Sequence, residues 1–534
     1  MVLLLPMNKM ESGITFHYLF FMFLIRKRRS QMSEKKDVVT TNESNELKRG
    51  IQGWQVAFIG LGGVIGSCYF LGLGGVMNTM GPAVFLAFGV VGVIVYGLMI
   101  AYAELLVNLP RKGSFIAYTN EFLGPTLSTG MGWSFWFNWV CYVPSEAIAV
   151  ATVLTGLMGS TGKVSFAAIA LGTMAALTII NLCAVDIFAK IESGLAITKV
   201  IIIILFVIVA FGVWVGLWGS DPSGTYTGFL AGNVNFGGTV SFGQMLFPAG
   251  FFVVITNMTT VLVTFQGTEI VGLAAAESQN PEESVPKACK SVTYRIVGLY
   301  LLPIILLILI LPYSLASDSE AVFATAMNYY QLGPFAFIFS AVVLVAAFSC
   351  ANTGFYGTVR AMFGLSVEGL APKFLSNVTK TGNPRNSVLF TLLGMWIVLV
   401  MGLIATLTGA LESLYSSLLN LSGFTGTLAW IGIIMSQMVF RRRLRKNGYD
   451  PDTCLKARVK PSQCWLPAFA AIAQIICLIM LVFDSPIIFI IAVAAVVIPM
   501  VGYRIAKSTG KLRDISTLGA GEKTFEETFP PLNK

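Results

Sequence analysis

The amino-acid sequence predicts an all-α polytopic membrane protein, and its composition and hydropathy pattern indicate that class. Of its 534 residues, 55% are hydrophobic and 11% are charged, whereas soluble domains carry about 25% charged residues. The mean hydropathy is +0.77, and long apolar runs follow one another with short polar breaks between them. No polar stretch is long enough to hold a soluble domain, so most of the chain is expected to lie in a membrane.

Apolar windows of about 20 residues, the length that crosses a bilayer as a helix, predict about twelve membrane spans. The predicted spans are 54–77, 81–108, 128–158, 163–185, 188–217, 246–276, 291–315, 332–363, 386–410, 413–440, 463–483 and 485–506. They form one membrane domain, 51–508, between an N-terminal tail, 1–50, and a C-terminal tail, 509–534. Residues 14–25 are apolar but too short to span a membrane. They are either an interfacial segment or part of an upstream extension, 1–31, with Met32 as a candidate start, and the sequence leaves both interpretations open.

Basic residues gather on one side of the predicted spans. That side holds Arg111, Lys112 and the block RRRLRK at 441–446, whereas the opposite loops hold one basic residue, Lys163. Because loops rich in Lys and Arg stay in the cytoplasm, both termini are expected there and the protein in the cytoplasmic membrane. The net charge of +9 then reflects topology, and no nucleic-acid partner is needed to explain it.

The first predicted span contains GGVIGSCYFLGLGG at 62–75. Each glycine costs a helix about 1 kcal/mol relative to alanine, and non-helical backbone at membrane depth survives only where it lines a cavity. We therefore expect an unwound segment whose second half-helix, starting near Ser67 and Cys68, directs a positive dipole end at an anion. Free carbonyls beside it attract a cation, so a ligand with a carboxylate and an ammonium fits. Alternatively, the glycines only permit close helix packing.

The sixth predicted span is interrupted in the same way. It reads VLVTFQGTEIVGLAAAE at 261–277, with Gln266, Gly267, Thr268 and Glu269 well inside it. These polar residues predict a second break in a membrane helix.

The spacing of the spans indicates an internal repeat. Gly66 and Gly267 are about 200 residues apart, and the four spans after each break begin at similar offsets. The repeats are expected at about 54–217 and 246–440, followed by two further spans at about 463–506. Since five spans are an odd number, the second repeat inserts upside down. Paired interrupted helices in an inverted repeat point to a substrate site at the membrane midplane.

Charged residues inside the spans are candidates for function, because a buried carboxylate or ammonium is costly unless it is paired or neutralised. Glu269 could take up a proton, face a cationic substrate side chain, or hold the unwound segment by a structural hydrogen bond. Glu277, eight residues further, could act at a gate or lie solvated at the interface.

Lys199 lies within the fifth span, about 16 Å from its cytoplasmic end at 1.5 Å per residue. A lysine removed from water can bind and release a proton, so we expect a role in proton coupling; a lysine that only braces helices is the alternative. Glu104, Glu146 and Glu192 lie near predicted span ends, where solvation is expected.

The sequence argues against an enzyme. Its one histidine, His17, lies in the N-terminal tail, and its eight cysteines lack the spacing of metal ligands or of a disulfide framework. No paired carboxylates lie on one predicted helix face. We therefore expect no metal, no cofactor and no disulfide.

The ordered motifs of the chain resemble the amino acid–polyamine–organocation superfamily, and specifically its bacterial and fungal amino acid permeases. The resemblance runs from about Leu47 to Met438. Its motifs are GGVIGSCYFLG in the first span, AYAELL at 101–106, LPRKGSFIAY at 109–118, FQGTEIVGLAAAESQNPEESVPKA at 265–288, VEGLAPKFL at 367–375 and NLSGFTGTLAW at 420–430. The family fold is the leucine-transporter-like 5+5 inverted repeat with two extra helices and with spans 1 and 6 unwound, which agrees with the repeat described above.

The candidate substrate-binding residues are those of the two predicted breaks: Ile65, Gly66, Ser67, Cys68, Phe265, Gln266, Gly267 and Glu269. The resemblance implies that Gly66–Cys68 bind the substrate carboxylate, that backbone near Ile65, Phe265 and Gln266 binds the amino group, and that Glu269 lines the side-chain pocket. It also implies that Lys199 lies where sodium-coupled relatives hold sodium. With Glu269 and Glu277, Lys199 is a candidate for proton coupling.

The resemblance implies proton-coupled uptake of an amino acid. FQGTE is closest to the basic amino acid permeases, which favours lysine or arginine. Cys68-Tyr69-Phe70 stands where the family has Gly and then Leu-Phe, so a reshaped pocket and a neutral substrate stay open. An amino acid or polyamine exchanger is the alternative within transport, and a non-transporting membrane amino acid sensor is the alternative from another class. Besides substrate and protons, membrane lipids are the expected partners.

Overall fold

The computed structural model describes residues 62–111, 113–159, 162–182, 185–219, 241–275, 281–379, 383–409, 414–510 and 523–532, and over these residues it is helical without strands. Its α-helices are α3 (Leu73–Met80), α4 (Val84–Asn108), α5 (Ser114–Leu123), α6 (Pro125–Leu157), α7 (Lys163–Asn181), α8 (Val185–Trp214), α9 (Phe242–Leu246), α10 (Phe251–Thr256), α11 (Met258–Val263), α12 (Ile270–Ala275), α13 (Pro281–Ile310), α14 (Val322–Tyr329), α15 (Gly333–Val367), α16 (Arg385–Leu407), α17 (Leu414–Lys446), α18 (Pro451–Cys454), α19 (Trp465–Asp484), α20 (Pro486–Ser508) and α21 (Phe525–Thr528). Short 3-10 helices lie at Gly81–Ala83, Tyr313–Leu315, Lys373–Ser376 and Pro461–Gln463, and a π-helical turn, η1, at Cys68–Gly72.

Nine helical segments of the described residues are long and apolar enough to cross a membrane. They are Cys68–Asn108, Pro125–Leu157, Lys163–Asn181, Glu192–Trp214, Gly333–Val367, Arg385–Leu407, Leu414–Lys446, Pro461–Phe483 and Pro486–Ser508. The first of them contains parts of two predicted spans. The sixth predicted span is divided into the short helices α10, α11 and α12, and α13 contributes the shorter apolar stretch Gly298–Ile310.

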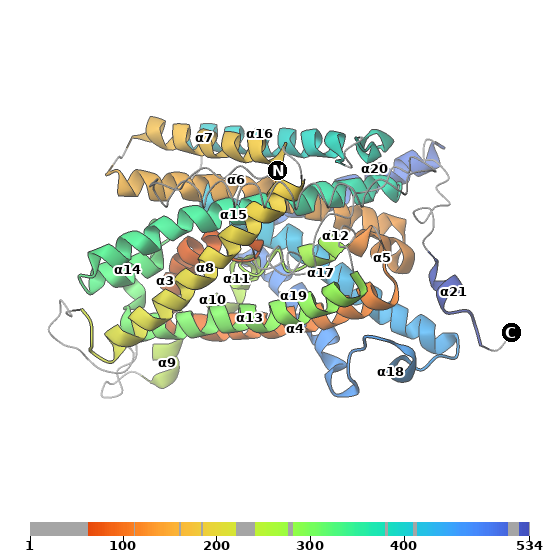
Figure 1. Cartoon of the computed structure of the whole chain (residues 1–534), viewed down its shortest axis with the longest axis horizontal. Coiled ribbons are helices and arrows are strands. Elements are labelled where there is room, and N and C mark those ends of the chain that lie inside the picture. Colours follow the sequence, from red (N-terminus) through yellow and green to blue (C-terminus); the bar gives the residue numbers. More distant parts are fainter. Residues whose placement is uncertain are drawn as a thin grey trace, which may run out of the picture. The chain divides into compact units, whose positions relative to one another are not determined.

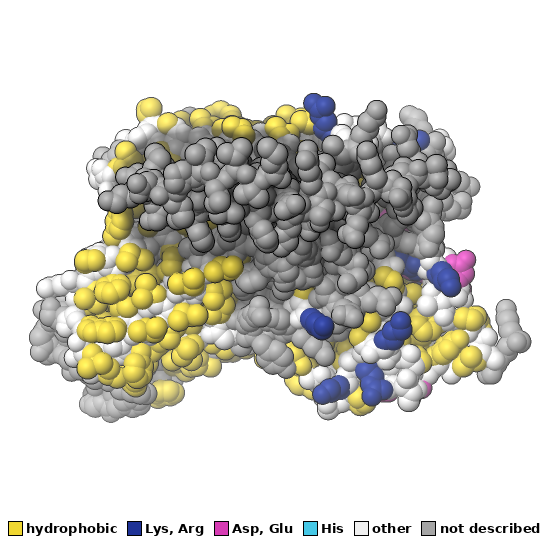
Figure 2. All heavy atoms as spheres, viewed as in Figure 1, with side chains coloured by type: hydrophobic (Ala, Val, Ile, Leu, Met, Phe, Trp, Pro, Cys, Tyr) yellow, Lys and Arg dark blue, Asp and Glu magenta, His cyan; other side chains and the backbone are white. Residues whose placement is uncertain are grey.

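Two long helices lie inside the bundle and others lie at its surface. In the most apolar 18-residue stretch of α6 and of α17, 78% of the residues are buried; in the corresponding stretch of α7 17% are buried, and in that of α20 6%. Helix α6 packs against α15, α17, α20 and α7. In Figure 1, α7 and α16 lie along the top of the view, with α6 and α15 below them. The outer helices expose large apolar side chains, such as Ile201, Ile204 and Ile208 on α8, as expected of surfaces that face lipid. In Figure 2 the hydrophobic side chains in view gather mainly at the lower left, and most of the Lys and Arg side chains lie at the lower right, toward the end where α18 lies.

The glycine-rich stretch of the first predicted span is non-helical from Gly63 to Gly66, and the π-helical turn η1 follows Ser67. We call Gly62–Ser67 the first break. A second break, Thr264–Glu269, separates α11 from α12. The two breaks touch: a Cβ atom built on Gly267 would lie 2.4 Å from the carbonyl oxygen of Gly63. Gly267 also has φ +104°, a left-handed conformation that other residues rarely adopt.

Glu104 near the end of α4 is not solvated, contrary to the expectation from its position. It is 1% exposed and forms a two-pronged ion pair with Arg441 of α17, with N–O distances of 2.8 Å. Gln437 and the backbone N–H of Val459 also donate to its carboxylate. The prediction failed because a tertiary contact, which helix position does not reveal, supplies the partners that water would otherwise supply.

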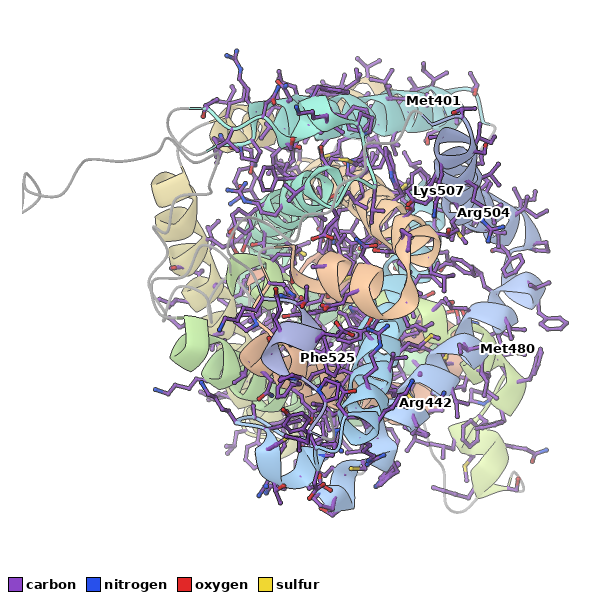
Figure 3. All side chains as sticks on the ribbon, turned by 90° about the vertical axis from the view of Figure 1, so that its right-hand side faces the viewer. Met401, Arg442, Met480, Arg504, Lys507 and Phe525 are labelled. Atoms are coloured by element: carbon purple, nitrogen blue, oxygen red, sulfur yellow. The ribbon has the colours of Figure 1, made fainter. Side chains whose placement is uncertain are left out.

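The C-terminal segment 523–532 folds back on this region. Phe525 on α21 is 1% exposed and its ring packs edge-on against Phe122 of α5 and Phe440 of α17, among the side chains seen in Figure 3. The backbone N–H of Phe525 donates to Glu121 over 2.8 Å. The segment therefore joins the ends of α5 and α17.

Candidate functional site

The side chain of Lys199 on α8 holds the first break from one side. Its ammonium donates to the carbonyl oxygens of Gly62 and Ile65 over 2.7 Å and 3.0 Å, and to the hydroxyl of Ser349 on α15 over 2.8 Å. Lys199 is 0% exposed. A charged amine has three N–H donors, and each of them has a partner here. The unwound backbone thus supplies the carbonyls that stabilise a buried cation.

Glu192 belongs to the same buried cluster and lies two turns before Lys199 on α8. It accepts a short hydrogen bond from the hydroxyl of Ser349 and one of 3.4 Å from the amide of Asn352. A Cβ atom built on Gly62 would lie 1.9 Å from its carboxylate, so the first break rests directly against it. Glu192 is 0% exposed. The expectation of a solvated helix end was therefore wrong, because α8 begins at Val185 and carries this side chain into the bundle.

The other side of the first break faces Glu146 on α6. The backbone N–H of Ser67 lies 3.1 Å from both carboxylate oxygens of Glu146, and Glu146 is 1% exposed. A Cβ atom on Gly66 would lie 2.3 Å from that carboxylate, so glycine is required for this approach. Glu146 was also expected to be solvated, and this was wrong because α6 runs from Pro125 to Leu157 and places it deep within the helix. An anion thus occupies the start of the half-helix, where the helix dipole favours one.

Sulfur and phenol groups surround this contact. The thiol of Cys68 lies 3.0 Å from the hydroxyl of Tyr142 on α6, and Cys350 on α15 donates to the carbonyl of Gly63 over 3.0 Å. The hydroxyl of Ser67 lies 2.9 Å from that of Tyr415 on α17. Side chains from α6, α15 and α17 therefore meet at the first break.

At the second break, Glu269 has two hydrogen bonds to one of its oxygens. The backbone N–H of Gly267 donates over 3.0 Å and the indole of Trp430 on α17 over 2.8 Å. Glu269 is 1% exposed. These contacts give it the structural role that was one of the alternatives, since they hold the turn that contains Gly267.

The flanking residues of the second break bind both α17 and the first break. The amide of Gln266 donates to the carbonyls of Ser422 and Gly423 over 3.3 Å each. The ring of Phe265 stacks on Tyr300 of α13, with 4.6 Å between centroids. The hydroxyl of Tyr300 lies 2.9 Å from the carbonyl oxygen of Val64 and 2.7 Å from that of Thr264. This phenol therefore links the two breaks.

The structure brings together nearly all residues predicted to form the site, since Ile65–Cys68, Phe265–Gly267, Glu269 and Lys199 lie in or against the two breaks. Glu277 lies outside the described residues. The sequence analysis missed the contacts from other helices: Tyr142, Glu146, Glu192, Tyr300, Ser349, Cys350, Tyr415 and Trp430. For Glu146 and Glu192 the sequence did hold a signal, since each is a carboxylate inside an apolar run and could have been predicted to lie at the site.

The chemistry of these residues is that of binding. Backbone N–H and C=O groups that regular helix does not use, an ammonium and three carboxylates converge on the breaks. The described part of the chain has no cluster of three or more His, Cys, Asp or Glu residues able to hold a metal ion. Groups of this kind can bind a zwitterion and transfer protons. An all-helical membrane bundle with two interrupted helices at such a site defines a membrane transporter.

The chain belongs to the amino acid permease family, whose sequence pattern matches residues 55–515. It is 33% identical to the amino-acid permease RocC of Bacillus subtilis, over 76% of this chain and 83% of that protein. It is 29% identical to the lysine-specific permease LysP of Escherichia coli, over 77% and 82% of the two chains, and 30% identical to the gamma-aminobutyric acid permease of Bacillus subtilis, over 75% and 81%. The protein is therefore an amino acid permease, a multi-pass membrane transporter and not an enzyme.

Proposed function

We propose that the protein is a proton-coupled amino acid uptake carrier. The observation that carries this proposal is the contact of Lys199 with the first break: its ammonium donates to the carbonyls of Gly62 and Ile65. An ammonium at these carbonyls takes the place of a metal cation, and unlike a metal it can lose its charge by releasing a proton. Proton binding and release at Lys199 would then strengthen and weaken the contact that holds the unwound backbone, because a charged donor makes the stronger hydrogen bond. Glu269 and Glu277 are further candidates for proton coupling.

The proposed substrate site is the pair of breaks. The substrate carboxylate would replace the Glu146 carboxylate at the N–H of Ser67, beside Gly66 and Cys68, where a buried carboxylate already lies. The substrate amino group would bind backbone carbonyls near Ile65, Phe265 and Gln266.

A basic amino acid is the favoured substrate. Glu269 offers a buried carboxylate at the second break beside Gly267, and a carboxylate in this position would attract a cationic side chain. The name of the lysine-specific relative agrees with this, whereas that of the gamma-aminobutyric acid permease keeps a substrate without a cationic side chain open.

The proposed architecture is twelve spans in one membrane domain, 51–508, with spans 1 and 6 unwound and a 5+5 inverted repeat formed by about 54–217 and 246–440. Both tails would lie in the cytoplasm and the protein in the cytoplasmic membrane. The two breaks in contact, about 200 residues apart in sequence, support this arrangement.

The experiment is uptake of radiolabelled lysine into proteoliposomes with an inward proton gradient, with each of the twenty amino acids as a competitor. We expect accumulation that a protonophore abolishes, with lysine and arginine competing best. If neutral amino acids compete best, the proposed proton coupling stands and the proposed substrate becomes a neutral amino acid. Uptake only into preloaded vesicles would make the protein an exchanger, and binding without any uptake would make it a sensor; either result contradicts symport.

A further inference from the structure

The buried groups around Lys199 contain a second charge that the proposed function does not use. Lys199 and Glu192 lie on the same helix, both 0% exposed, and the hydroxyl of Ser349 connects them. Lys199 donates to the Ser349 oxygen over 2.8 Å, and the Ser349 hydroxyl in turn donates a short hydrogen bond to Glu192. Three groups therefore form one directed chain from ammonium to carboxylate.

A hydroxyl in the middle of such a chain is the group that can pass a proton on, because it donates one hydrogen bond while it accepts another. We propose that Glu192 is the proton acceptor of Lys199 and that Ser349 relays the proton between them. This rests on the proposed function, in which Lys199 releases a proton in each transport cycle. It adds the route and the acceptor, which the family resemblance does not specify.

The step balances without any other reactant. An N–H bond of the Lys199 ammonium breaks as its proton moves to the Ser349 oxygen, and the Ser349 proton moves to Glu192. The serine hydroxyl is restored, the ammonium becomes a neutral amine, and the carboxylate becomes a carboxylic acid. No net charge is created in the bundle, and two opposite charges in a medium of low dielectric are neutralised together.

The surrounding geometry suits both states. As an ammonium, Lys199 uses its three donors on Gly62, Ile65 and Ser349. As an amine it keeps two donors for the two carbonyls and accepts from Ser349, while the protonated Glu192 donates to Ser349. The chain of hydrogen bonds reverses direction over the same heavy atoms, and both ends stay in contact with the first break, since Glu192 lies against Gly62.

Other titratable groups lie near this chain of hydrogen bonds. Glu146 on α6, Cys68 on η1 and Cys350 on α15 interact electrostatically with Lys199, and Lys199 interacts with Glu192. Glu146 is held by the N–H of Ser67, whereas Glu192 has the direct hydroxyl link to Lys199. The geometry therefore favours Glu192 as the acceptor.

The test measures proton and amino acid movement together. Purified protein in proteoliposomes receives radiolabelled lysine, and a pH-sensitive dye inside the vesicles reports proton influx. The variants are Ser349→Ala, which breaks the chain and keeps both charges, and Glu192→Gln, which removes the acceptor; Ser349→Thr is the matched control that retains a hydroxyl. Lysine exchange at equal pH on both sides and the melting temperature are measured for each variant.

For Ser349→Ala and Glu192→Gln we expect gradient-driven uptake and proton influx to fall about tenfold or more, as when a proton-transfer group is lost. Exchange falls much less than coupled uptake, because exchange needs no net proton release, and Ser349→Thr keeps coupled uptake. The melting temperature of Ser349→Ala should stay near that of Ser349→Thr, whereas Glu192→Gln should lower it, because it leaves the buried Lys199 ammonium without its counter-charge. The relay is overturned if Ser349→Ala moves protons as the wild type does, or if Ser349→Ala and Glu192→Gln lose exchange together with uptake. If the wild type and Lys199→Ala both take up lysine without proton influx, the proposed symport itself fails.

Discussion

Single glycines decide whether the two breaks can meet. At Gly267 two features require the absence of a side chain: the left-handed φ of +104°, and the 2.4 Å that would separate an added Cβ atom from the Gly63 carbonyl oxygen. A Cβ atom added to Gly66 would likewise lie 2.3 Å from the Glu146 carboxylate. The glycines therefore serve backbone-to-backbone and backbone-to-carboxylate contacts, and the packing-only alternative does not account for them.

Replacement of Gly267 by alanine adds one methyl group and tests whether the contact between the two breaks requires glycine. We expect Gly267→Ala to lower uptake about tenfold or more and to cost about 1–3 kcal/mol of stability, as for other strained backbone positions. Uptake in proteoliposomes and melting temperature are the measurements. Gly89→Ala on α4 is the control, because a Cβ there meets nothing within 4 Å; it should be neutral or gain up to about 1 kcal/mol. Wild-type uptake in Gly267→Ala would contradict the requirement for glycine.

At the scale of elements, a buried ion pair ties three segments together. Glu104 on α4 accepts from Arg441 and Gln437 on α17 and from the N–H of Val459 in the following loop. Arg441 also donates to the carbonyl of Val459 over 2.7 Å. Its side chain is 8% exposed and that of Glu104 is 0% exposed. Loss of one partner would therefore leave the other without compensation in the protein interior.

We expect Arg441→Met to destabilise the protein by about 3–5 kcal/mol, since it leaves the Glu104 carboxylate buried and unpaired. The double variant Glu104→Gln/Arg441→Met should recover most of this loss, as measured by melting temperature in detergent. Arg443→Met is the matched control: Arg443 and Glu526 are 36% and 64% exposed and 3.8 Å apart, so its cost should stay below about 1 kcal/mol. If Arg441→Met lowers the melting temperature no more than Arg443→Met does, the Glu104–Arg441 pair contributes little to stability.

At the scale of the whole molecule, the orientation in the membrane is a proposal that rests on the distribution of basic residues. Cys454, on the short helix α18, is an exposed thiol beyond the end of α17 and reports on this side of the molecule. Partial burial and the nearby Asp450 carboxylate raise the pKa of the Cys454 thiol. Because the thiolate is the reactive form, its labelling speeds up as the pH rises.

A membrane-impermeant thiol reagent should therefore label Cys454 in inverted vesicles and leave it unlabelled in intact cells, with a rate that still increases above about pH 8, near the ordinary thiol pKa. Cys454→Ser identifies the signal, and Cys464, the other exposed thiol of the described chain, is expected to react from the same side. Labelling of Cys454 in intact cells would reverse the proposed orientation.

The sequence by itself determined the class of protein and pointed to the two breaks around which the candidate site is built. Composition and apolar runs of about 20 residues indicate a helical membrane protein, because a helix of that length crosses the bilayer and satisfies its own backbone hydrogen bonds. The local conflict between glycine and helix marked the first break, and polar residues inside an apolar run marked the second. The ordered motifs indicated the amino acid permease family, to which the chain belongs. Lys199 was found in the same way, as a charge in an apolar run.

The tertiary structure decided the partners. Glu104, Glu146 and Glu192 look alike in sequence, yet one binds Arg441, one the N–H of Ser67 and one the hydroxyl of Ser349. No local pattern distinguishes them, since each partner lies on a distant segment of the chain and meets its carboxylate only through packing. Whether a buried carboxylate is structural, faces substrate or accepts a proton depends on the group placed within about 3 Å of it, and only the folded chain fixes that group.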